Sequence, residues 1–270
     1  MAAHYLDFER PIADLEAKIE ELSRLSDSAG SGDINPEVDA LRARVATLRR
    51  DAYAKLDPWQ KTQVARHPER PHTLGYIAGL IEDFVELRGD RRFGDDQAVV
   101  GGMGRFRGMP VVVIGHEKGH DTTTRVKHNF GMARPEGYRK VQRLVRLAGH
   151  LGLPVVTFVD TAGAYPGVGA EERGQGEAIA RSTERCLTLG TPMIATITGE
   201  GGSGGALAIA AANKVLILEH AVYSVAAPEA AIKAVGDAVE DELKVLLTLS
   251  PDELRTQRAD RFYAIGTIGQ

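Results

Sequence analysis

Two glycine-rich segments, each placed directly after an apolar stretch, constrain the fold of this chain more than any other feature. The first is Asp160–Gly169, and the second is Gly199–Leu207, which leads into the small-residue run Ala206–Ala212. Because the first N–H groups of a helix have no partner within it and carry partial positive charge, they can bind an anionic or polarised oxygen. Glycines let that oxygen approach the backbone without meeting a Cβ. The second segment therefore predicts an oxyanion hole at a helix start.

Apolar and amphipathic stretches alternate from Pro71 onward, which is typical of strands alternating with helices. Such alternation indicates an α/β fold with a parallel or mixed sheet, in which ligands bind at the carboxyl ends of the strands. Both glycine-rich segments fall at such ends. The predicted elements are helices over Thr73–Glu86, Pro135–His150, Gly174–Leu189 and Gly205–Ala212, and strands over Ala98–Phe106, Met109–Gly115, Pro154–Asp160, Pro192–Thr198 and part of Lys214–Val225.

The first part of the chain shows a different pattern. Apolar residues recur at three- and four-residue spacing from Ile12 to Leu25 and again from Val38 to Leu56, with charges between them. The second run follows Asn35-Pro36, a pair typical of a helix start. We expect two helices that form a hairpin or short coiled coil and end at Asp57-Pro58. Packing and partner contact are the expected roles, since no chemical constellation accompanies them.

Composition excludes several classes of function. The formal charge of −4 gives no reason to expect nucleic-acid or membrane binding. The single cysteine, Cys186, excludes an internal disulfide and a cysteine-based zinc site, and the eight histidines show no metal-ligand spacing. We therefore predict no metal. With no apolar run of membrane-spanning length and no signal-peptide pattern, the expected location is cytoplasmic.

Other chemical interpretations of the same residues stay open at this point. Ser203 could be a nucleophile, but it needs a base and no histidine lies nearby in sequence. Glu171 and Glu172 could act as acid and base, although adjacent residues on a helix do not face each other. The basic stretch around Lys118 and Arg134 is either a solvated loop or, near the glycines, a clamp for a phosphate or carboxylate.

Several longer motifs, taken together and in order, identify a family. From roughly the first helix to Val225, the chain resembles the alpha subunits of bacterial acetyl-coenzyme A carboxylase carboxyltransferase. Several long motifs matching together are far more specific than any single glycine pattern. The motifs that carry the resemblance are Val100–Gly102, Ile114–Gly119, Asn129–Met132, Arg134–Lys140, Asp160–Gln175 and Gly199–Leu207.

The resemblance implies a crotonase-like spiral fold and transfer of a carboxyl group from N-carboxybiotin to acetyl-CoA, giving malonyl-CoA for fatty acid synthesis. It implies a zinc-ribbon beta subunit with which the site is shared, a biotin carboxyl carrier protein, a separate biotin carboxylase and two copies of each carboxyltransferase subunit. Carboxybiotin and acetyl-CoA are then substrates. On this resemblance the catalytic oxyanion hole is Gly204 and Gly205, facing the biotin ureido oxygen. The expected substrate-binding residues are Gly163, Ala164, Tyr165, Gly167, Gly201, Gly202, Lys118 and Arg134.

The resemblance also sets expected boundaries: a helical hairpin over residues 1–57, a crotonase-like carboxyltransferase domain over 58–225 and a C-terminal helical segment over 226–270. Relative to the family pattern, a block of residues is missing near Val225 and Ala226, and omission of flexible residues from the sequence is favoured over a true deletion. Two rivals share parts of the argument. One is a stand-alone acyl-CoA hydratase or isomerase, for which Glu171, Glu172 and Glu200 are the nearby carboxylates, and the other is a non-catalytic scaffold subunit.

Overall fold

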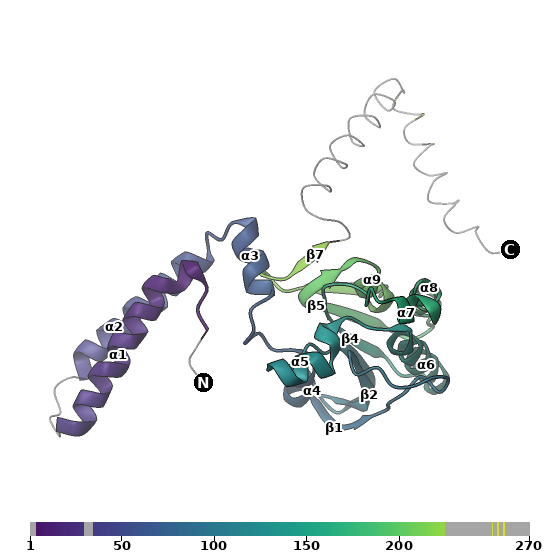
Figure 1. Cartoon of the computed structure of the whole chain (residues 1–270), viewed down its shortest axis with the longest axis horizontal. Coiled ribbons are helices and arrows are strands. Elements are labelled where there is room, and N and C mark those ends of the chain that lie inside the picture. Colours follow the sequence, from purple (N-terminus) through teal and green to yellow (C-terminus); the bar gives the residue numbers. More distant parts are fainter. Residues whose placement is uncertain (1–3, 30–34, 225–249, 251–252, 254–255, 257–270) are drawn as a thin grey trace. The chain divides into compact units, whose positions relative to one another are not determined.

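A computed structural model describes residues 4–29 and 35–224, together with Ser250, Glu253 and Thr256 (Figure 1). The chain divides into two compact units, of which the first ends at Tyr223 and the second begins at Ser224. Apart from Ser250, Glu253 and Thr256, the expected C-terminal helical segment and the break near residue 225 lie outside the described residues. The boundary expected at residue 57 stays a prediction.

Two long helices begin the chain, as their periodicity predicts. After a short 3₁₀ turn, η1 (Asp7–Glu9), they are α1 (Arg10–Ala29) and α2 (Asn35–Tyr53). Ile12 of α1 and Val38 and Val45 of α2 are buried, and an ion pair of 2.6 Å joins Arg49 to Glu16 across the two helices. The apolar stripes are therefore used for packing helix against helix.

Asp57-Pro58 begins a further helix instead of only ending the second one. The Asp57 side chain accepts a hydrogen bond from the Gln60 N–H, while the Gln60 side chain accepts one from the Asp57 N–H. This reciprocal capping box, with Pro58 in the first turn, starts α3 (Pro58–Ala65). The same residues that predict a stop thus also hold the start signal of α3.

A mixed sheet forms the centre of the fold, as the alternation of elements predicts. Its strand order is β1-β2-β3-β4-β5-β6, and β7 also pairs with β5. The first three strands are antiparallel neighbours, whereas β3, β4, β5 and β6 are parallel. The strands are β1 (Ile81–Glu86), β2 (Val99–Phe106), β3 (Met109–His116), β4 (Val155–Thr161), β5 (Met193–Gly202), β6 (Lys214–Ile217) and β7 (Val222–Ser224).

The helix expected over Thr73–Glu86 is wrong in its second half. Only α4 (Thr73–Leu80) is helical, and Ile81–Glu86 is strand β1. β1 pairs antiparallel with β2, with Ile81 opposite Phe106. Pairing with β2 makes this segment a strand, and the residues of the segment by themselves do not show that β2 lies beside them.

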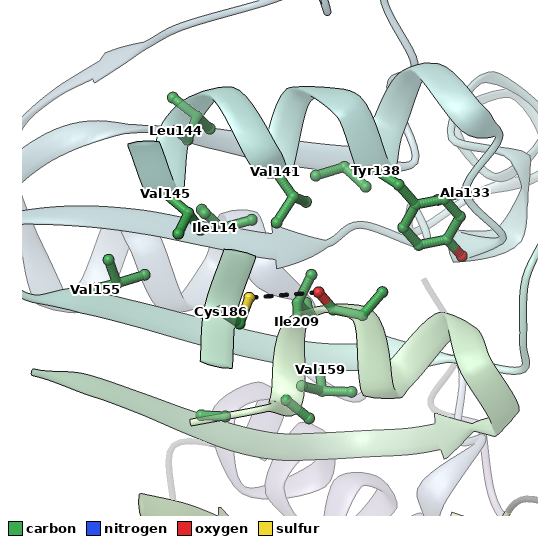
Figure 2. Close-up of a cluster of buried hydrophobic side chains, with 14 of the residues drawn as sticks. Ile114, Ala133, Tyr138, Val141, Leu144, Val145, Val155, Val159, Cys186 and Ile209 are labelled. Atoms are coloured by element: carbon green, nitrogen blue, oxygen red, sulfur yellow. Dashed lines mark hydrogen bonds between the residues drawn. The ribbon is translucent and has the colours of Figure 1, made fainter. Parts of the chain in front are cut away.

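Helices cover the two faces of the sheet, and the side chains along each strand point alternately to one face and to the other. Val112 and Ile114 of β3 join the larger core on one face, while Val111 and Val113 join a smaller core with Ile77 of α4 on the other. The larger core is shown in Figure 2. The buried thiol of Cys186 belongs to it and lies 3.6 Å from the Ala208 carbonyl oxygen. The helices on that face are α6 (Pro135–Leu151), α8 (Gln175–Leu187) and α9 (Ser203–Ala210). Three shorter helical elements lie in the connecting segments: α5 (Thr122–Lys127), η2 (Asn129–Gly131) and α7 (Val168–Glu172).

Parallel pairing brings three chain segments to one edge of the sheet. β3 ends at His116, β4 at Thr161 and β5 at Gly202, and parallel strands share the edge at which they end. The segment containing Lys118 and both glycine-rich segments therefore meet at this edge. Its arrangement is the one expected for a ligand site in a sheet of this kind.

Candidate functional site

The second glycine-rich segment makes a sharp turn from β5 into α9. Ser203, the first residue of the helix, has a φ of +50°, which is the left-handed region that non-glycine residues rarely adopt. Among the described residues, the backbone N–H groups of Gly204 and Gly205 have no hydrogen-bond partner. Strained backbone next to unpaired donors is typical of a functional turn. The geometry is compatible with the predicted oxyanion hole, and the catalytic role of the two glycines stays a prediction.

Most glycines of this segment also meet a packing demand. A Cβ added to Gly202 would lie 2.1 Å from the Ala162 carbonyl oxygen, and one on Gly205 would lie 2.8 Å from the Ala164 nitrogen. A Cβ on Gly201 would lie 2.5 Å from the Tyr223 ring. Gly204 differs, because its nearest neighbour would be Ile179 Cγ2 at 3.4 Å. Close approach of the two loops thus accounts for much of the glycine density.

The first glycine-rich segment connects β4 to α7 and is more open. Gly163 has a φ of +153° with nothing within 4 Å of an added Cβ, and its N–H donates to Thr161 Oγ1. Gly167 makes room for the Tyr165 ring, because its added Cβ would lie 2.2 Å from Cε1. The Arg134 guanidinium stacks over the same ring at 4.8 Å from its centre. The structure therefore brings Gly163, Tyr165, Gly167 and Arg134 together around one loop.

A cluster of charged side chains joins the two segments. Lys118 Nζ lies 2.8 Å from Asp160 Oδ1 and 2.7 Å from Glu200 Oε2. Arg66 Nε donates to the other oxygen of Glu200 at 2.6 Å, and the Glu200 N–H donates to Asp160 Oδ1 at 2.9 Å. His72 Nδ1 is 2.9 Å from Asp160 Oδ2. Each carboxylate is therefore held by at least two donors.

The surroundings keep both carboxylates ionised. Burial by itself would raise the pKa of Asp160, but the hydrogen bond from His72 and the Lys118 ammonium outweigh it, so that the pKa is below its ordinary value. The pKa of Glu200 is lowered in the same way, because Lys118 and Arg66 outweigh the effect of burial. Ionised Asp160 and Glu200 are thus part of the electrostatic framework of this edge.

A cavity of about 240 Å³ opens at this cluster. Of the residues expected to bind substrate, only Lys118 lines it, together with Ala162 of the first segment; neither Gly204 nor Gly205 does. Its wall combines three cationic groups, one carboxylate and several apolar side chains. The lining residues are Ala65, Arg66, His67, His72, Lys118, Arg125, Phe130, Met132, Ala162 and Glu200.

His72 and Arg66 are site residues that the sequence does not predict. They precede Lys118 by dozens of positions and belong to no glycine motif, so that no local signal points to them. Their place in the cluster depends on the fold, which brings the segment between α3 and α4 against the ends of β4 and β5.

Two alternative chemical roles receive no structural support. Glu171 and Glu172 are both exposed on α7, and neither is paired with another carboxylate. Among the described residues, Ser203 has no hydrogen bond to a histidine or carboxylate that could act as its base. The structure as described holds no group of three or more His, Cys, Asp or Glu side chains able to bind a metal ion.

The mixed sheet, the helix layer and the unpaired amides at a strand-to-helix turn define an α/β protein with a candidate anion-binding site at the carboxyl ends of its parallel strands. A family model described as acetyl co-enzyme A carboxylase carboxyltransferase-like matches residues 5–235. The chain belongs to this family.

Named relatives agree over the whole chain. An acetyl-coenzyme A carboxylase carboxyl transferase subunit alpha of Caulobacter vibrioides (strain NA1000 / CB15N) is 63% identical, with 100% of this chain and 99% of the relative covered. The corresponding subunit of Phenylobacterium zucineum (strain HLK1) is 61% identical with the same coverage. The first alignment extends over 318 positions, although this chain has 270 residues. Relatives therefore hold residues without a counterpart here, while the place and origin of the break expected near Val225 stay predictions.

Solved structures show the same fold. A transcarboxylase 12S chain with hydrolysed methylmalonyl-coenzyme A bound gives a TM-score of 0.52 at 18% identity, covering 75% of this chain and 38% of that chain. A single-chain, multi-domain long-chain acyl-CoA carboxylase gives 0.51 at 22% identity, covering 64% of this chain and 17% of that chain. The present chain thus spans a minor part of these larger proteins. In the described part of the chain, no helix is both long enough and apolar enough to span a membrane.

Proposed function

We propose that this chain is the alpha subunit of an acetyl-CoA carboxylase carboxyltransferase. In the proposed reaction the bond between the carboxyl carbon and the biotin nitrogen breaks, and a new bond forms to the methyl carbon of acetyl-CoA. The methyl proton passes to the biotin nitrogen, so that no side-chain base is needed. The products are malonyl-CoA and biotin. This transfer is one half of a two-step cycle, in which the cyclic urea of biotin first gains the carboxyl group and then gives it up.

The observation that carries the proposal is the pair of unpartnered N–H groups at Gly204 and Gly205 in a chain of this family. Release of the carboxyl group leaves negative charge on the ureido oxygen, and fixed donors stabilise such charge. Removal of one oxyanion donor typically raises the barrier by about 2.7–4 kcal/mol. Gly205 is held against the first segment by close packing, which fixes the direction of the helix start.

The proposal includes partners. A beta subunit of the same fold would complete the site, in keeping with the fact that neither Gly204 nor Gly205 lines the cavity of this chain. We expect two copies of each subunit, a biotin carboxyl carrier protein that delivers the donor, and a separate biotin carboxylase. A cytoplasmic location would suit this assembly.

Reconstitution tests the proposal. The chain is co-expressed with a zinc-ribbon beta subunit of the same family, and malonyl-CoA formation from acetyl-CoA and carboxylated carrier protein is measured. We expect product only when both subunits are present. Full activity of the alpha chain alone would contradict the shared site, and no activity of the co-purified complex would contradict the function.

A hydratase activity has less support. It requires free carboxylates at the site, whereas Glu200 is bound by both Lys118 and Arg66 and the pair Glu171 and Glu172 is solvent-exposed. Hydration of an enoyl-CoA by the isolated chain would reverse this ranking.

A further inference from the structure

The oxyanion argument gives no role to His72, a buried residue at the charged cluster. His72 is 4% exposed and is one of the residues that line the cavity, and its Nδ1 lies 2.9 Å from Asp160 Oδ2. The other ring nitrogen, Nε2, is buried and has no hydrogen-bond partner among the described residues. A buried polar atom left unpaired costs about 1–3 kcal/mol, so its retention needs an explanation. A bound ligand would supply one.

The hydrogen bond to Asp160 determines which ring nitrogen of His72 carries a proton. As an ionised carboxylate, Asp160 can only accept hydrogen bonds, so Nδ1 of His72 must carry the proton. In the neutral ring Nε2 is then an acceptor with a free lone pair. Lys118 and the Glu200 N–H hold the other oxygen of Asp160, which fixes the carboxylate in place. A ligand that satisfies Nε2 of the neutral ring brings an N–H or O–H donor.

The rest of the cavity narrows the choice of ligand. Arg125 lines it and forms no ion pair with a carboxylate among the described residues, since its contacts are carbonyl oxygens at 3.5 Å. Phe130 also lines it and is 48% exposed on a strained turn, where Asn129, Phe130 and Gly131 have φ of 50°, 54° and 76°. A cation, an acceptor and an exposed ring suit a planar, anionic ligand that carries an N–H group.

We propose that His72 is a positioning residue for the carboxyl donor, whose cyclic urea donates its ring N–H to Nε2 and lies against Phe130. This inference rests on the proposed function. An N-carboxylated cyclic urea has one remaining ring N–H and a carboxylate for Arg125, whereas the reacting end of an acetyl thioester has no donor. Asp160 acts through His72 by holding its tautomer.

Two substitutions separate positioning from a structural role. In His72→Asn the side-chain amide can still donate to Asp160 from the place of Nδ1, but nothing replaces Nε2. His72→Gln places its polar group near Nε2 and gives up the Nδ1 position. The assay uses the complete complex of alpha and beta subunits and follows transfer of the carboxyl group from malonyl-CoA to free biotin.

We expect His72→Asn to raise the KM for free biotin about tenfold, the value of one hydrogen bond, with the KM for malonyl-CoA unchanged. His72→Gln should recover most of this loss. The exposed His150→Asn serves as the matched control. A structural role predicts the reverse order, with His72→Asn close to wild type and His72→Gln impaired, and that result would overturn the inference.

A measurement on the wild type covers the case in which the variants do not fold. In a complex labelled with ¹⁵N-histidine, the Nε2 resonance of His72 should move toward the hydrogen-bonded position when free biotin is added, and acetyl-CoA alone should not move it. An unchanged resonance at saturating biotin in an active complex refutes the role of His72 alone. A wild-type complex that transfers no carboxyl group to biotin refutes the proposed function itself.

Discussion

The two glycine-rich segments look alike in sequence but use their glycines differently. In the second, additional Cβ atoms on Gly201, Gly202 or Gly205 would meet neighbouring atoms at 2.1–2.8 Å. In the first, Gly163 has open space around it and needs its glycine for the backbone angle. Gly202 and Gly205 are glycines because the backbone of the first segment lies against them, whereas Gly163 is a glycine because of its backbone angle.

This difference separates the glycines that packing explains from those that indicate a ligand site. Five glycines between Gly199 and Gly205 suggest a ligand site because they exceed the need of a turn, yet close contact with the first segment explains most of them. Gly204 is the one glycine of the helix start for which packing demands less. Glycine density alone is therefore weak support for an oxyanion hole, and the unpaired N–H groups are the stronger support.

The largest expected effect comes from removing a donor from the second segment. Gly204→Pro deletes one N–H that has no partner in the helix, so we expect the kcat of the complete complex to fall about 100-fold or more. Gly204→Ala keeps the N–H and should lose far less. Both are made in a Ser203→Gly background, because proline restricts the residue before it and Ser203 has a left-handed φ. Equal losses in the two variants would contradict a role for this amide.

The next largest effect is on stability, and it tests whether the charged cluster around Lys118 holds the two segments together. Lys118→Met leaves the buried carboxylates of Asp160 and Glu200 without their shared cation, and should lower the free energy of unfolding by about 3 kcal/mol. Arg181→Met breaks an exposed pair with Glu177 and should cost less than about 1 kcal/mol. Urea denaturation of the full chain measures both. Similar losses would show that the cluster does not hold the segments together.

A smaller effect tests the packing explanation directly. Gly202→Ala places a methyl group against the Ala162 carbonyl, and we expect a loss of about 2 kcal/mol in unfolding free energy. Gly176→Ala, in helix α8 with nothing within 4 Å, should instead gain about 0.5–1 kcal/mol. Thermal unfolding of the two variants compares them. A neutral Gly202→Ala would mean that the segments are not in close contact.

The smallest expected effect is a change in stability at acid pH. Because the pKa values of Asp160 and Glu200 are lowered by folding, the stability from their ionised forms is complete above their unfolded pKa values and is lost as pH falls through the folded ones. The difference in unfolding free energy between wild type and Lys118→Met should therefore be constant near neutral pH and shrink below about pH 4. A difference that stays constant to about pH 2.5 would show that Lys118 acts through packing instead of charge.

The sequence by itself determined the α/β class, the family and most of the elements. The positions of β2, β3, β4 and α6 follow from local apolar patterns, which report burial of one face or both. It placed both glycine-rich segments correctly at strand ends, because strand and turn signals act over a few neighbouring residues.

Tertiary structure alone decided which residues meet. Ile81–Glu86 became a strand because β2 offered a pairing edge, and His72 reached Asp160 because the segment before α4 lies against the end of β4. The glycines of the second segment acquired their packing role only through the first. Contacts between residues far apart in sequence depend on the path of the whole chain, and no local pattern records that path.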